Sequence, residues 1–164
     1  MKKSYALTII LANAMLFGCK KEEPVVADTA AKTVLVAPAD PMDNLAWQNY
    51  AREVVKRNMQ GISERTFNYY LPHSATEGFQ GQYQRQLEIV QGVVYRTVLP
   101  GNMLTFVSPD SEKMADFIVE AYALAPDNAM KGVRVLFIGK PTDNERVKAA
   151  MAHTNPDYVF VSTE

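Results

Sequence analysis

The second half of the chain alternates short apolar runs with segments of helical periodicity, and this alternation restricts the fold more than any other feature. The apolar runs are MLTFVS, GVRVLFIG and DYVFVST, which begin at Met103, Gly132 and Asp157. Continuous apolar strands joined by helices are typical of parallel sheets with covered faces and right-handed crossovers. We therefore expect an α/β fold in which a helical N-terminal part precedes a small β-α-β-α-β parallel sheet covered by helices.

The two connecting segments carry helix signals. In the first, Ser108 is the expected N-cap and Pro109 lies in the first turn. In the second, Thr142 and Glu145 have the spacing of a capping box. The apolar residues of the first segment recur at helical spacing and predict a buried stripe of Met114, Phe117, Ile118, Ala121 and Leu124.

The preceding part of the domain is predicted to be helical. Asp40 and Pro41 resemble an N-cap followed by proline at the first helical position. Apolar residues at helical spacing continue to Met59, and a second helical piece is expected from Ser63 through Tyr70. A further helix is predicted over residues 81–98, although the β-branched residues in GVVYRTV favour a strand there.

The chain begins with a basic start and a short apolar stretch, residues 6–17. A stretch of this length is too short to span a hydrocarbon core of about 30 Å as a helix. Together with the small residue Gly18, the pattern is that of a secretory signal peptide covering residues 1–18.

The end of this stretch, Leu16-Phe17-Gly18-Cys19, resembles the lipobox of bacterial lipoproteins. Phe17 departs from the pattern, because a small residue is usual there. The resemblance implies cleavage before Cys19, lipidation of its sulfur and acylation, for example with palmitate, of the new amino end. Lys20 follows the cysteine where aspartate would favour the inner membrane, so the implied location is the outer membrane, facing the periplasm. The alternative is a general secretion signal with a chance cysteine.

We expect a lipidated tether over residues 19–41 and a single globular domain over residues 42–164. The tether lacks aromatic residues and helical periodicity, so it buries too little surface to offset its ordering entropy. The alternative is that residues 33–38 form a short edge strand. The chain has 17 basic and 18 acidic residues, and no basic patch predicts a nucleic-acid partner.

The loop predicted over residues 72–82 contains the best candidates for chemistry outside the helices. It holds His73, Ser74, Glu77 and Phe79, which suggest a contact surface, a hydrolytic site or a pair of metal ligands. The chain has two histidines, fewer side chains than a zinc site usually needs, and we expect no metal. No glycine-rich phosphate loop follows the predicted strands, so we expect no nucleotide cofactor.

Charge is placed unevenly on the helix that follows the strand at Met103. Glu112, Asp116 and Glu120 recur every four residues and lie opposite the predicted buried stripe. Like charges at this spacing are mildly unfavourable in an isolated helix. The acidic face is therefore either a solvated surface or a contact for a basic partner.

These features favour a non-catalytic protein-binding module held at the membrane. In class and size the chain resembles the periplasmic immunity lipoproteins of toxin–immunity pairs, which neutralise envelope-acting toxins delivered by secretion systems. The resemblance implies a protein partner, with Glu112, Asp116, Glu120, His73 and Phe79 as candidate contacts. The alternatives are an assembly lipoprotein of the envelope or of a secretion machine, and a periplasmic hydrolase that uses His73.

Overall fold

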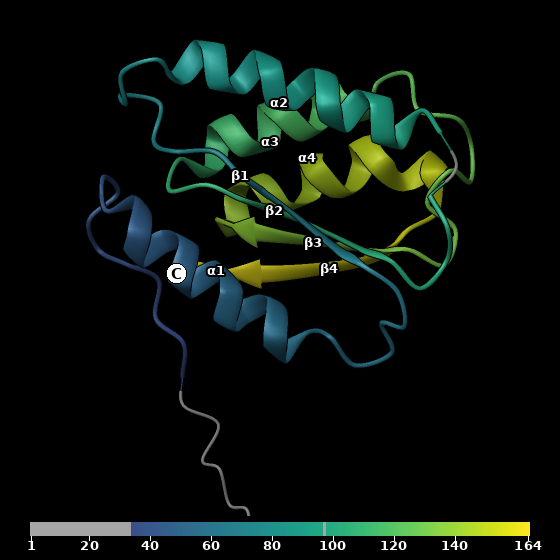
Figure 1. Ribbon diagram of the computed structural model, residues 1–164, viewed down its shortest axis with the longest axis horizontal. Coiled ribbons are helices and arrows are strands. Elements are labelled where there is room, and N and C mark those ends of the chain that lie inside the picture. The colour runs from purple at the N-terminus through teal and green to yellow at the C-terminus, as the bar shows by residue number, and fades with distance from the viewer. Residues whose placement is uncertain (1–33, 97) are drawn as a thin grey trace, which may run out of the picture. The chain divides into compact units, whose positions relative to one another are not determined.

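The computed structural model describes residues 34–96 and 98–164 (Figure 1). The predicted signal peptide, Cys19 and the tether up to Thr33 lie outside the described residues.

A parallel sheet of four strands forms the centre of the domain. The strands are β1 (Thr66–Tyr70), β2 (Met103–Val107), β3 (Arg134–Gly139) and β4 (Asp157–Ser162). They lie in chain order, β1-β2-β3-β4, and every neighbouring pair is parallel. The predicted α/β class and its parallel sheet are therefore confirmed.

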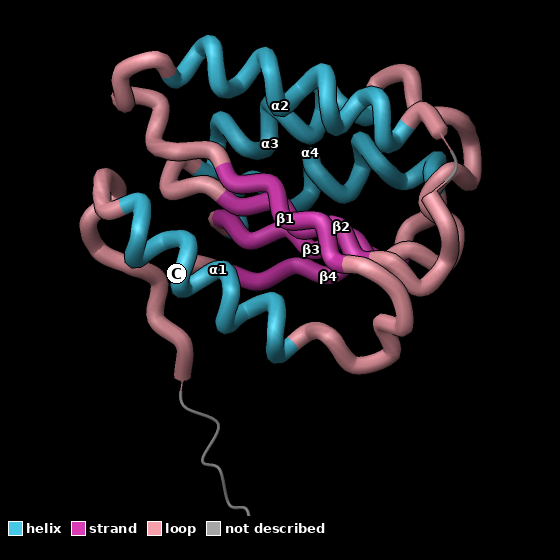
Figure 2. Tube along the Cα trace, viewed as in Figure 1, coloured by secondary structure: helices cyan, strands magenta, loops and turns pink. Residues whose placement is uncertain are grey.

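Helices cover the two faces of the sheet unequally (Figure 2). The connecting helices α2 (Phe79–Val94), α3 (Ser111–Tyr122) and α4 (Pro141–Met151) share one face, and α4 continues into a 3-10 turn, η1 (Ala152–Thr154). The opposite face is covered by α1 (Asn44–Arg57), which precedes the first strand. Right-handed crossovers between strands in chain order account for this division, because each one returns over the same face.

The sheet separates two apolar cores. The larger core joins Leu104, Phe106 and Phe137 to the three-helix layer. The smaller core packs Trp47 and Val54 of α1 against the other face. Strands β2 and β3 contribute to both cores, so their central residues are buried on each side. This explains why the sequence of these strands is continuously apolar rather than alternating.

The prediction of a helix from Ser63 through Tyr70 was wrong, because this segment contains strand β1. Its sequence, TFNYY, consists mostly of β-branched and aromatic residues, which fit a pleated surface better than a helix. Phe67 and Tyr69 pack on the larger core and Tyr70 packs on the smaller one. The side chains alternate between the faces as the strand period requires.

Several predicted helix ends were also displaced. Helix α1 begins after Asp43, whose carboxylate accepts a hydrogen bond from the Ala46 N–H at 2.9 Å, rather than at Asp40. Helix α3 is capped by Asp110 instead of Ser108 and ends at Tyr122, so Leu124 lies beyond it and is 77% exposed.

The capping box predicted in the last connecting helix does not form. Pro141 occupies the first turn and starts α4 directly after Lys140, before Thr142 could act as N-cap. By contrast, the helix predicted over residues 81–98 is confirmed as α2, with its bounds shifted to Phe79–Val94.

The last residues of the predicted tether already pack on the domain. Leu35 and Ala37 contact the smaller core, and the Trp47 indole donates a hydrogen bond to the Asp40 carbonyl at 3.0 Å. The segment is irregular, so the alternative edge strand over residues 33–38 is not seen in its described part. The packed domain therefore extends upstream of residue 42.

Replacing Leu35 by Ala should lower the free energy of unfolding by about 1 kcal/mol, because the side chain loses part of its buried apolar surface. The matched change Val36→Ala should have little effect, since Val36 is 79% exposed. Urea unfolding followed by tryptophan fluorescence measures both. Equal midpoints for the two variants would show that the segment does not support the core.

Candidate functional site

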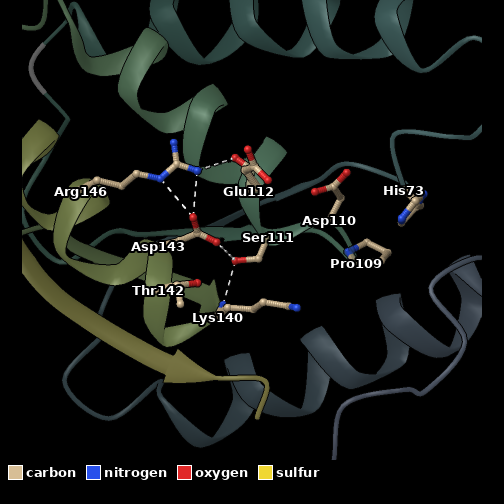
Figure 3. A pocket seen from close by; sticks show the side chains of 9 residues that line it. All are labelled: His73, Pro109, Asp110, Ser111, Glu112, Lys140, Thr142, Asp143 and Arg146. Atoms are coloured by element: carbon tan, nitrogen blue, oxygen red, sulfur yellow. Dashed lines mark hydrogen bonds and ion pairs between the residues drawn. The ribbon is translucent and has the colours of Figure 1, made fainter.

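The carboxyl edge of the sheet gathers the turns that follow β1, β2 and β3. A polar crevice of about 580 Å³ lies there between the first turns of α3 and α4 (Figure 3). It is lined by His73, Pro109, Asp110, Ser111, Glu112, Lys140, Thr142, Asp143 and Arg146. In parallel α/β sheets this edge is the usual place for binding groups, because loops and helix N-termini meet there.

A buried hydroxyl–carboxylate pair joins the two helix starts inside the crevice. The Ser111 hydroxyl donates to Asp143 Oδ2 at 2.7 Å and accepts a hydrogen bond from the Lys140 backbone N–H at 2.8 Å. Ser111 is 4% exposed and Asp143 is 7% exposed. A Cβ at Gly139 would lie 2.7 Å from the Ser111 oxygen, so a side chain at this position would crowd the pair. The pair thus depends on close approach of β3 to α3.

Arg146 extends this pair into a network across α3 and α4. Its guanidinium donates to Asp143 Oδ1 at 2.9 Å, to Asp116 Oδ1 at 2.6 Å and to the Glu112 carbonyl at 2.9 Å. Lys113 donates to the other Asp116 oxygen at 3.1 Å. The carboxylates of Asp116 and Asp143 are therefore neutralised within the fold.

The same contacts shift the pKa of Asp116. Partial burial by itself would raise the pKa of this carboxyl, but hydrogen bonds from Arg146 and Lys113 outweigh it and hold the pKa below its ordinary value. The network therefore favours the charged form of Asp116 in the folded state.

A second set of hydrogen bonds arranges the loop after β1. The Ser74 hydroxyl donates to Asp110 Oδ2 at 2.5 Å, while Asp110 Oδ1 accepts from the Lys113 N–H at 3.3 Å and caps α3. His73 Nδ1 accepts a hydrogen bond from the Ala75 N–H at 3.2 Å. The Ser74 proton is directed at a carboxylate rather than at His73, which is not the serine–histidine geometry of a nucleophilic triad.

The predicted acidic face is divided between different surroundings. Glu112 is exposed on the rim of the crevice, whereas Asp116 belongs to the Arg146 network. Glu120 is exposed beside a neighbouring hollow of about 420 Å³ between α2 and α3, and it accepts a hydrogen bond from the Tyr83 hydroxyl at 3.1 Å. Burial, and then this hydrogen bond, raise the pKa of the Tyr83 hydroxyl. Asp116 is therefore mainly a structural residue, and Glu112 and Glu120 remain available at the surface.

Phe79 lies at the edge of the same hollow but offers little surface. Its side chain is 8% exposed and packs against Tyr83, with ring centroids 5.9 Å apart. The prediction of a loop at Phe79 was wrong, because Phe79 is the first residue of amphipathic α2 and faces the core. His73 is half-buried and lines the crevice.

Comparisons with protein families, with curated protein sequences and with solved structures found no match. Within residues 34–96 and 98–164, no three His, Cys, Asp or Glu side chains are grouped as ligands for a metal ion. None of the helices in those ranges has the length and apolar character needed to cross a membrane.

Acidification should weaken the fold partly through Asp116. A carboxyl whose pKa is lower in the folded than in the unfolded state contributes stability above its unfolded pKa and loses it as the pH falls through the folded pKa. Asp116→Asn should therefore reduce stability at pH 7 and flatten its decrease below about pH 4.

Thermal unfolding from pH 7 down to about pH 2 provides the measurement. Asp127→Asn serves as the control, because it removes an exposed carboxylate outside the network. If the Asp116 and Asp127 variants had the same pH dependence, the network would not stabilise the charged form of Asp116.

Proposed function

We propose that this chain is a lipid-anchored, non-catalytic protein-binding module of the bacterial envelope, and that it acts as an immunity protein against an envelope-acting toxin. The lipid anchor rests on the Leu16–Cys19 motif and on the signal-like segment before it. The binding role rests on the charge left exposed at the carboxyl edge of the sheet.

The observation that carries the binding role is the contrast between the interior and the rim of this edge. In the interior, Ser111, Asp143 and Arg146 bond to one another across two helices. On the rim of the crevice Glu112 has no described cation within ion-pair distance, and neither has Glu120 beside the neighbouring hollow between α2 and α3. Lys140 is an exposed cation of the crevice, and its Nζ lies 3.7 Å from Glu164 Oε1. Glu112 on the rim and Glu120 farther along α3 therefore present acidic groups that suit a basic surface on a partner.

Catalysis is a weaker proposal for the same edge. A hydrolase needs a nucleophile whose proton is taken by an oriented base. The hydroxyls of Ser74 and Ser111 donate to carboxylates that cap or join helices, at Asp110 and Asp143. These bonds suit a rigid binding surface better than a reacting centre.

The anchor is tested by replacing Cys19 with Ser. Because a thioether needs the cysteine sulfur, the variant should remain an unprocessed precursor that a metabolic fatty-acid label does not mark. Wild-type protein should carry the label and fractionate with the outer membrane. Equal labelling of both proteins would exclude lipidation at Cys19.

The partner-binding role is tested with Glu112→Lys. This change should leave folding nearly intact, because exposed substitutions usually alter stability by less than about 0.5 kcal/mol. It should slow association with a basic partner by about tenfold at low salt, and the difference should shrink as salt rises. Glu88→Lys is the matched control, since it makes the same charge change on the exposed face of α2.

The assay for the immunity role begins in the organism. Cells lacking the protein should be killed by neighbours that deliver the toxin, and wild-type protein and the Glu88 variant should restore survival. Purified toxin identified in this way then serves for association rates across a salt series. An envelope defect in pure culture, without attacking neighbours, would favour the assembly role instead.

A further inference from the structure

Among residues 34–96 and 98–164, strand β1 is an edge of the sheet, and no strand pairs with its outer side. The Met103 N–H donates to the Arg65 carbonyl, and the Leu71 N–H donates to the Val107 carbonyl. Every second residue of β1 therefore directs its backbone N–H and C=O toward β2. In parallel pairing the residues between them direct their backbone groups outward. Within the described part of the chain, no group forms a hydrogen bond with the outward backbone groups of Thr66 and Asn68. The outward Tyr70 carbonyl accepts a hydrogen bond from the Gln86 side-chain amide at 2.6 Å.

The sequence of β1 does not protect this edge. Natural sheets usually block their edges with lysine, proline, a bulge or a covering segment. The strand TFNYY contains neither a charged residue nor proline, and four of its five residues are β-branched or aromatic. Such an edge readily accepts a further strand.

A hollow of about 220 Å³ borders β1 on the α1 face of the sheet. Its walls are Ala51 and Val55 of α1 and Val107 of β2, and the exposed side chains of Arg52 and Asn68 stand at its rim. Arg52 brings a positive charge to a hollow whose lining contains no acidic residue. The site therefore suits a group that is negative at one end and apolar along its stem.

Thr105 supplies an independent indication that this hollow takes a polar ligand. Thr105 is fully buried, and its hydroxyl has no hydrogen-bond partner in the described chain. Met103 and Val107 pack on the α1 side, so Thr105 between them faces the same side and lines the hollow. A buried hydroxyl without a partner is unfavourable, and a carboxylate in the hollow would satisfy it.

The other face of β1 borders a hollow of a different character. It measures about 440 Å³ and lies where β1 meets the end of α2. Its apolar lining consists of Phe67, Val93, Val98 and Leu99, which is 69% exposed, and its polar lining of Glu64, Arg65 and Asn102. Apolar side chains on an incoming strand would find partners here.

We propose that β1 binds an extended segment of a partner protein, added as a fifth strand, in which acidic side chains alternate with apolar ones. Successive side chains of a strand point to opposite faces. The acidic residues enter the hollow with Arg52 and Thr105, and the apolar ones cover Phe67 and Leu99. Main-chain bonds to Asn68 supply affinity, and the two hollows select the sequence.

The probe is a fluorescent peptide of about nine residues that alternates glutamate and valine. Its control alternates lysine and valine, which keeps the strand propensity and reverses the charge. Anisotropy titration of the purified protein should show the glutamate peptide binding at least about tenfold more tightly than the lysine peptide. Equal affinities, or no binding of the glutamate peptide, would overturn the proposal.

Variants locate the peptide. Arg52→Glu should reverse the preference between the two peptides, whereas Arg85→Glu, the same change on the exposed face of α2, should preserve it. Thr105→Val removes the hydroxyl but keeps the side chain about the same size. It should weaken binding of the glutamate peptide about tenfold. If Arg52→Glu kept the wild-type preference, the peptide would lie elsewhere and the proposal would fail.

Asn68→Pro tests the backbone contact. Proline removes an N–H that points away from β2, so the ladder within the sheet is kept and binding should be lost. Circular dichroism checks the fold, and if this variant is unfolded, Arg52→Glu and Thr105→Val decide the question. Glu112→Lys should bind the peptide normally, which separates this site from the surface proposed at the carboxyl edge.

Discussion

The division of helices between the two faces of the sheet determines where this domain is closed and where it is open. Three right-handed crossovers between strands in chain order place α2, α3 and α4 on one face, and of the described helices α1 is left for the other. Four strands extend over about 14 Å from the first axis to the last, whereas a helix with its side chains is about 10 Å wide. One helix therefore cannot cover that face, and the uncovered part lies beside β1, where the hollow with Arg52 and Thr105 is found.

The three-helix layer is joined by charge as well as by apolar packing. Arg146 of α4 reaches Asp116 of α3, and Asp143 binds Ser111 at the start of α3. Removing one partner of the buried Ser111–Asp143 pair is usually costly, because the other polar group is left without compensation. The network therefore sets the position of the two helix starts, and with them the shape of the crevice and the placement of Glu112 at its rim.

The near-neutral net charge of the chain conceals two surfaces of opposite character. The solvent-facing side of α3 exposes Glu112 at the carboxyl edge and Glu120 in the last turn, and the neighbouring cations already pair with other carboxylates. The hollow beside β1 contains Arg52 and no acidic residue. These surfaces suit partners of opposite charge, a basic surface at the first and an acidic strand at the second. A formal charge of −1 for the whole chain predicts neither.

Local sequence determined the strands at Met103, Arg134 and Asp157, because they are continuous apolar runs, and the helices between them, because their apolar residues recur at helical spacing. It did not reveal β1, whose sequence TFNYY is interrupted by Asn68 and lacks the continuous apolar run of the other strands. Nor did it reveal that Asp116 binds Arg146, thirty positions away in the sequence. Packing also turned Phe79 into the core. Both candidate surfaces were decided by tertiary structure, because each combines residues from several elements that only crossover handedness and helix packing bring together.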